Sequence, residues 1–187
     1  MAAVRLEKIR DYVIALRPVY TDKGDATEIY LANGEVKVFY SGIKAVRRAF
    51  LKNYAVDFFE QQRLLSQEFG KSRLLPFYID ERVFIPLKMR KTVSKNDMVN
   101  GYVEVGAVRD FKREGRLSCL ICLATGAEIP LTCGEETLIK SFHMGKRLQE
   151  RLVREREDKG LEYKYKAADS LLTLVAELGA VMGKKQG

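Results

Sequence analysis

The sequence predicts an α+β protein: an antiparallel sheet of short strands and hairpins, one helix after the first hairpin, and two C-terminal helices. Three observations support this class. Tight turns join the β-prone runs, helical patterns gather in the middle and at the end of the chain, and strands do not alternate regularly with helices. Without that alternation, a doubly wound parallel sheet is disfavoured. The chain has 187 residues, 47% of them hydrophobic, which is enough to bury a core.

The first part of the chain carries the clearest hairpin signal, Asn33-Gly34 between two β-prone runs. A type I′ turn needs positive φ at both central residues, and Asn-Gly is the pair that adopts it most readily. The elements expected here are a helical start at 3–10, strands at 12–18, 26–31 and 35–40, and a polar turn at 20–25.

A helical segment is expected next. Ser41 is predicted to be its N-cap, because a hydroxyl can accept a hydrogen bond from the first free backbone N–H groups. Ile43, Val46 and Phe50 recur at steps of three and four residues, which places them on one face of the helix. The helical pattern ends near Gly70, with a break expected around 55–59.

The second half predicts a further run of strands followed by helices. The expected elements are strands at 74–79, 82–87, 102–108, 117–124 and 126–131, a charged turn at 111–115, and helices at 135–156 and 167–182. A charged linker at 155–166 is expected to separate the two helices. We therefore predict a basic core at 1–156, followed by the linker and an amphipathic helix at 157–187. The apolar stripe of this helix, which should pack on the core or on a second subunit, consists of Leu171, Leu174, Leu178 and Val181.

No motif for catalysis appears in the structural context that it requires, so we expect no enzyme activity and no cofactor. Gly70-Lys71-Ser72 resembles the end of a phosphate-binding loop, but a helix rather than a strand precedes it. Cys119 and Cys122 have a zinc-ligand spacing within an apolar, strand-like run. Residues three apart on a strand point to opposite faces, so a shared metal is not expected.

Charge favours a polyanionic partner. The formal net charge is +8, and residues 36–56 hold five basic residues and no acidic one. No apolar run is long enough for a membrane-spanning helix, and the first residues lack the apolar stretch of a signal peptide. With three cysteines, an odd and sparse number, these features predict a cytoplasmic protein with free thiols and no membrane partner.

The basic residues form three candidate groups for binding DNA. The polar loop after the strand at 82–87 carries flexible cations, which can reach phosphates or enter a minor groove. A neighbouring turn extends this surface, and a helical stripe with one-turn spacing forms a third group. The candidate residues are Lys88, Arg90, Lys91 and Lys95 in the loop, Arg109, Lys112 and Arg113 at the turn, and Lys44, Arg48 and Lys52 in the stripe.

The order of segments over about residues 10–152 resembles the ComK competence transcription factors of Gram-positive bacteria. The matching segments are Tyr12-Val13-Ile14-Ala15-Leu16-Arg17-Pro18, the Asn33-Gly34 hairpin with the helix after Ser41, Leu75-Pro76-Phe77-Tyr78-Ile79, Val83-Phe84-Ile85-Pro86, Gly101-Tyr102-Val103 and Gly126-Ala127-Glu128-Ile129-Pro130-Leu131. The resemblance implies a transcription activator that binds A/T-rich DNA through the minor groove, bends it, and acts as a dimer or higher oligomer.

Two alternatives remain open beside a DNA-binding transcription regulator. One is an RNA- or ribosome-associated basic protein, for which the same excess of positive charge would serve. The other is a protein–protein interaction module whose C-terminal helix docks a partner and whose charge is incidental. Competition between duplex DNA and structured RNA separates the first two, and a steep salt dependence separates both from the third.

Overall fold

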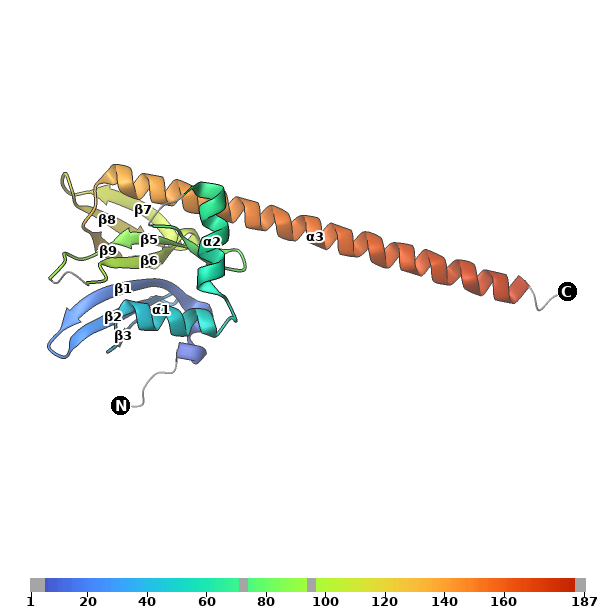
Figure 1. Cartoon of the computed structure of the whole chain (residues 1–187), viewed down its shortest axis with the longest axis horizontal. Helices are drawn as coiled ribbons and strands as arrows, with labels where there is room; N and C mark the ends of the chain where they lie inside the picture. The colour runs from blue at the N-terminus through green and yellow to red at the C-terminus, as the bar shows by residue number, and fades with distance from the viewer. Residues whose placement is uncertain (1–5, 71–73, 94–96, 184–187) are drawn as a thin grey trace. The chain divides into compact units, whose positions relative to one another are not determined.

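The computed structural model describes the backbone of residues 6–70, 74–93 and 97–183, and the side chains as far as residue 172. Two compact units divide the chain, residues 1–149 and residues 150–187. The first unit combines two antiparallel sheets with helices, which confirms the predicted α+β class (Figure 1).

The larger sheet, sheet A, has six strands in the order β3-β2-β1-β6-β5-β4, and every pair in it is antiparallel. Its strands are β1 (Val13–Thr21), β2 (Gly24–Leu31), β3 (Val36–Phe39), β4 (Phe77–Ile79), β5 (Arg82–Lys88) and β6 (Asn100–Glu104). The first hairpins form one half of the sheet, and β1 joins them to β6 in the other half.

Both turns of the first three strands are tight. The predicted Asn33-Gly34 hairpin is confirmed, and the Gly34 N–H donates to the Leu31 carbonyl. The expected type I′ turn was wrong, because only Gly34, at φ +88°, has positive φ and Asn33 does not. The expected polar turn at 20–25 is shorter than predicted. Strand β1 pairs with β2 as far as Thr21↔Gly24, and Gly24 takes φ +98° at the start of β2. Positive φ costs glycine little, so this turn can close over two residues.

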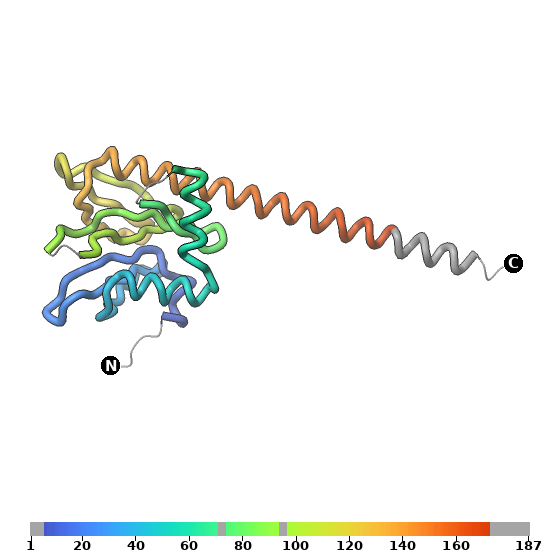
Figure 2. Tube along the Cα trace, in the orientation of Figure 1, coloured from blue at the N-terminus to red at the C-terminus, as the bar shows by residue number. Residues whose placement is uncertain are grey.

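Two helices follow the first three strands, α1 (Ile43–Lys52) and α2 (Phe58–Phe69), and they run in different directions (Figure 2). The predicted break at 55–59 is therefore confirmed. Ser41 was wrong as N-cap, because Gly42 occupies that position and no side chain caps the helix. At α2 the Asp57 carboxylate accepts from the backbone N–H groups of Phe59 and Glu60, a cap that the sequence analysis missed.

An aromatic core lies between α1 and sheet A. Phe50 of α1 contacts Phe77 and Phe84 edge-to-face, and the rings of Phe77 and Phe84 stack with 4.9 Å between centroids. The predicted apolar face of the helix supplies Ile43, Val46 and Phe50, all of which are buried. Packing at this density fixes the position of α1 on the sheet.

The smaller sheet, sheet B, has the order β7-β8-β9, with β7 (Val108–Arg113), β8 (Cys119–Leu123) and β9 (Glu128–Leu131). The single strand predicted at 102–108 was wrong. The 3-10 turn η3 (Val105–Ala107) divides it, so that β6 belongs to sheet A and β7 to sheet B. Val103, Val105 and Ala107 are nevertheless all buried.

The last element, α3 (Glu135–Gly183), is one continuous helix, so the predicted non-helical linker at 155–166 was wrong. Glu, Lys and Arg favour helices, and ion pairs one turn apart support the charged stretch, such as Lys166–Glu162 at 2.7 Å. Within the first unit Gly145 lets α3 approach sheet A closely, since an added Cβ would lie 2.4 Å from Ile85 Cγ2. Among the residues described here, no helix has the length and apolarity needed to cross a membrane.

Candidate nucleic-acid interface

Positive charge is concentrated in the first unit. Residues 1–149 contain 25 basic and 18 acidic residues, and therefore carry +7 of the formal net charge of +8. The basic residues of residues 150–187 are nearly balanced by acidic ones. A surface that attracts a polyanion is consequently to be sought in the first unit.

Helix α1 carries a stripe of free cations, which we call the α1 stripe: Lys44, Arg48 and Lys52. All three side chains are exposed, and α1 contains no acidic residue. Among the described residues, none forms an ion pair with them. Since a helix rises 1.5 Å per residue, the three cations follow one another at intervals of about 6 Å along the helix.

The residues beside the α1 stripe have short side chains. Ala45 and Ala49 are also exposed, and they lie next to the stripe on the outer side of α1. Arg47 takes a different role, because its guanidinium stacks on the Phe58 ring at 3.9 Å and donates to the Tyr102 hydroxyl. Arg47 therefore fixes α1 to α2 and β6, while the stripe stays available for a ligand.

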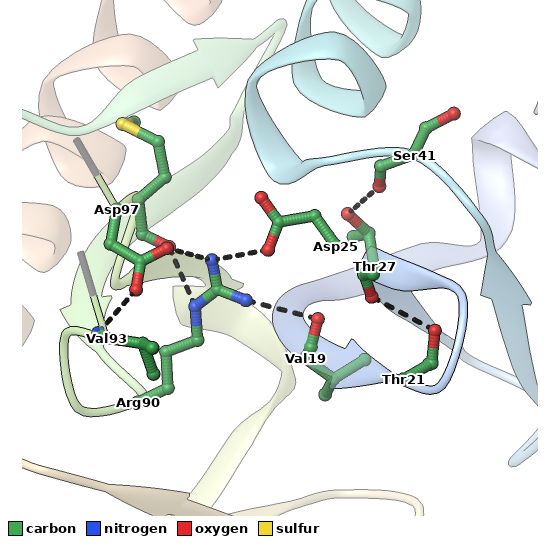
Figure 3. A network of polar contacts seen from close by, with 10 residues as sticks. Val19, Thr21, Asp25, Thr27, Ser41, Arg90, Val93 and Asp97 are labelled. Carbon is green, nitrogen blue, oxygen red and sulfur yellow. Dashed lines mark hydrogen bonds and ion pairs between the residues drawn. The ribbon is translucent and has the colours of Figure 1, made fainter.

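Arg90 does not lie where the sequence analysis placed it. We predicted a loop cation that reaches DNA, but the residue is buried, with 9% exposure. Its guanidinium donates to the Asp97 and Asp25 carboxylates and to the backbone carbonyls of Val19 and Met98 (Figure 3). With its donors used inside the protein, Arg90 is a structural residue and not an exposed loop cation.

The Arg90 network holds the start of the basic loop on the β1–β2 hairpin. The guanidinium also stacks on the Tyr20 ring, with 3.9 Å from Cζ to the centroid. Asp97, on the far side of the loop, accepts the backbone N–H of Val93 at 2.7 Å (Figure 3). Residues 90–93 are thereby tied to two other segments of the first unit.

Lys88 and Lys91 remain exposed at the two sides of Arg90, and neither has an ion-pair partner among the described residues. Along β5, Lys88 alternates with Leu87 and shares a side of sheet A with Pro86 and Phe84. Phe84 packs in the core beneath α1, so Lys88 and the α1 stripe lie on the same side of the sheet. Lys95, the fourth predicted loop residue, lies outside the described residues.

The third predicted group lies on β7, in sheet B, at a distance from α1 (Figure 1). Lys112 pairs with Glu128 at 2.9 Å, and this hydrogen bond raises the pKa of the lysine. Arg113 donates to the Gly115 carbonyl and lies 4.0 Å from a Glu135 oxygen. Arg109 is exposed, with no ion pair to the described residues. The structure thus does not unite this group with the α1 stripe.

Local sequence patterns do not reveal Asp25 and Tyr20 as partners of Arg90, because 65 and 70 positions of chain separate them from it. Asp97 was a usable signal, since it is the one acidic residue close to the basic loop in sequence. A cation with a carboxylate seven residues away can close a loop, and this pair does so at 3.0 Å.

The three cysteines are buried free thiols. On β8, Cys119 pairs with Leu131 and Cys122 with Glu128, so their side chains lie on opposite faces of sheet B, as their spacing predicted. Burial raises the pKa of Cys119 and Cys133, which keeps these thiols protonated at neutral pH. In the part of the chain that the structure describes, no cluster of three or more His, Cys, Asp or Glu residues could hold a metal ion.

No protein-family model, no curated protein and no solved structure matches this chain.

Proposed function

We propose that this protein is a cytoplasmic, non-enzymatic transcription regulator of the competence-factor type that binds A/T-rich duplex DNA. One observation carries the proposal. The outer face of α1 presents Lys44, Arg48 and Lys52 at one-turn spacing, exposed, with no acidic residue in the helix. Cations held on a rigid element and free of partners are what a row of phosphates attracts.

The α1 stripe suits a phosphate backbone better than the other candidate groups do. A cation already paired with a carboxylate gains less from a phosphate, because the carboxylate must first be released. This lowers the contribution expected from Lys112, whose partner is Glu128, and from Arg113, which lies near Glu135. Lys88 and Lys91 are unpaired with the described residues, and Lys88 shares the α1 side of sheet A, so we assign both to the same interface.

A preference for A/T-rich sequence follows from the kind of side chain available. The narrow minor groove of A-tracts has an enhanced negative potential, which attracts inserted Lys and Arg. Lys91 lies in a loop rather than on a helix, and can therefore project beyond the surface that α1 forms. We assign phosphate contacts to the α1 stripe and groove insertion to the loop.

Self-association is the second part of the proposal. From residue 154 to residue 172 every side chain of α3 is exposed, including Leu161 at 52%, Leu171 at 63% and Leu172 at 69%. Most of the stability of a helix in water comes from packing of an apolar face. We propose that a second copy of this chain covers that face, which would make the protein a homodimer.

Fluorescence anisotropy tests the DNA-binding proposal. The full chain is titrated into labelled A/T-rich duplex, G/C-rich duplex and structured RNA at several salt concentrations. We expect the tightest binding to A/T-rich duplex. The triple variant Lys44→Ala, Arg48→Ala, Lys52→Ala should reduce the slope of log K against log salt by roughly three, about one for each lost phosphate contact.

A matched control separates the effect of the α1 stripe on DNA binding from the effect of losing three positive charges anywhere on the protein. The triple variant Arg63→Ala, Lys140→Ala, Lys166→Ala removes the same charge, but each of these cations is paired with a carboxylate one turn away in sequence. It should bind nearly as tightly as the wild type. Equal losses in both triple variants, or tighter binding to structured RNA than to either duplex, would contradict the proposal.

A further inference from the structure

We propose that Val93 is an apolar wedge that enters the minor groove and partly unstacks a base step of the bound DNA. This inference rests on the proposed DNA binding and assigns a mechanical role to the loop that Arg90 holds. Proteins that bind the minor groove frequently insert an apolar side chain between base pairs and kink the duplex.

The exposure of Val93 is the first observation. Its side chain is 79% exposed, whereas Met89 in the same loop is 3% exposed and packs against Gly101. Isolated apolar residues on a surface are common, so exposure alone assigns no role. The neighbours matter here: Lys91 is two residues away, and Thr92 between them is also exposed. The segment thus presents an apolar tip beside Lys91, the cation to which we assign groove insertion.

The anchoring of the Val93 backbone is the second observation. A wedge must withstand the force of base stacking, which costs a few kcal/mol per unstacked step. The Val93 backbone N–H donates to Asp97, and Asp97 is only 6% exposed and is held by Arg90 (Figure 3). Arg90 in turn is anchored to Val19 and Asp25 of the β1–β2 hairpin. The backbone of Val93 is therefore tied, through an exposed hydrogen bond to Asp97, to the partly buried network around Arg90.

The third observation is the side of the molecule on which the loop begins. Lys88, the last residue of β5, lies on the side of sheet A that α1 covers. Near the start of α1, an added Cβ on Gly42 would lie 3.8 Å from the same Asp25 carboxylate that Arg90 contacts. The start of the basic loop and the N-cap of α1 thus both lie against Asp25, and Lys44, the first residue of the α1 stripe, follows this N-cap by two positions.

The experiment uses A/T-rich duplexes that each carry 2-aminopurine at a different TA step, because pyrimidine–purine steps unstack most readily. The fluorescence of this base rises when it unstacks. With the full-length protein we expect a rise at one step. Val93→Ser should abolish that rise while weakening affinity by about tenfold or less, since the lysine contacts remain. Val93→Leu should retain it.

Leu117→Ser serves as the control, because Leu117 is likewise exposed, at 71%, but lies on the β7–β8 turn of sheet B. It should leave both affinity and fluorescence unchanged. A rise that persists in Val93→Ser, or DNA binding by the wild type with no rise at any step, would overturn the wedge and leave the proposed function standing. Absence of binding to every duplex would overturn the proposed function instead.

Discussion

The Arg90 guanidinium and the Asp97 carboxylate form an ion pair in the interior of the first unit, with 3.0 Å between Nη2 and Oδ1. Their side chains are 9% and 6% exposed. Loss of one partner from a buried pair leaves the other charge without compensation. Arg90→Ala should therefore lower the free energy of unfolding by about 3 kcal/mol, measured by urea denaturation.

The double variant Arg90→Ala, Asp97→Ala separates the energy of the ion pair from the cost of leaving one charge without its partner. It should cost less than the sum of the two single variants, because no uncompensated buried charge remains in it; Asp25, the other carboxylate on Arg90, is 52% exposed. Lys91→Ala provides the neighbouring control and should change stability by less than about 0.5 kcal/mol, since its side chain is exposed. Equal, small effects of Arg90→Ala and Lys91→Ala would show that the buried pair does not stabilise the fold.

Gly101 is required where β6 passes between β1 and β5. A Cβ added at this position would lie 2.4 Å from the Leu16 carbonyl oxygen, and backbone cannot move aside as a flexible side chain can. Gly101→Ala should cost about 2–3 kcal/mol by overpacking. Gly106→Ala is the matched control, since its nearest neighbour would be at an ordinary 3.7 Å. The urea midpoints of Gly101→Ala and Gly106→Ala are compared, and equal midpoints would contradict the prediction.

The raised pKa of Tyr54 predicts that the folded state loses stability at alkaline pH. Burial, together with a hydrogen bond from its hydroxyl to Asp11, raises the pKa of Tyr54 from 10.0 to about 12. The protonated phenol is therefore favoured in the folded state. Its contribution to stability is complete below pH 10 and is lost as the pH rises towards about 12.

Tyr54→Phe should accordingly be less sensitive to pH than the wild type between pH 10 and 12, measured as urea midpoints across that window. Tyr12→Phe, at a tyrosine that is 58% exposed, should retain the wild-type pH dependence. If the urea midpoints of the wild type and Tyr54→Phe changed with pH in the same way, Tyr54 would not be the group responsible. Tyrosinate absorbance should also record one fewer late-titrating phenol in Tyr54→Phe.

The C-terminal part of α3 is predicted to mediate self-association. Light scattering on the full chain should give the mass of a dimer, and a chain ending at Asp158 should give the mass of a monomer with an unchanged melting temperature. The stripe that this truncation removes is Leu171, Leu174, Leu178 and Val181. Identical subunit stoichiometry in the two chains would exclude α3 as the interface.

Metal removal should leave this protein folded. Cys119 and Cys122 lie on opposite faces of β8, so their sulfurs cannot bind a common ion. We expect elemental analysis of protein purified without chelator to find no stoichiometric zinc, and a chelator to leave the circular dichroism spectrum unchanged. One zinc per chain, lost together with the fold, would contradict this prediction.

Local patterns in the sequence determined the class of the fold, the Asn33-Gly34 hairpin, the apolar face of α1 and the α1 stripe on its opposite side. Each of these depends on residues within a few positions of one another, whose spacing directly sets their geometry. Local composition does not distinguish a linker from a helix at 155–166, because charged residues that suit a linker also support a helix through pairs such as Lys166–Glu162.

Only the tertiary structure decided the role of Arg90. In the sequence it is one of several cations in a polar stretch, and nothing local distinguishes it from Lys91. Folding brings Val19, Tyr20 and Asp25 of the β1–β2 hairpin to it across about 70 positions of chain, and their combined hydrogen bonds offset the cost of burying its charge. Contacts of such sequence separation depend on strand order and register, which no short pattern encodes.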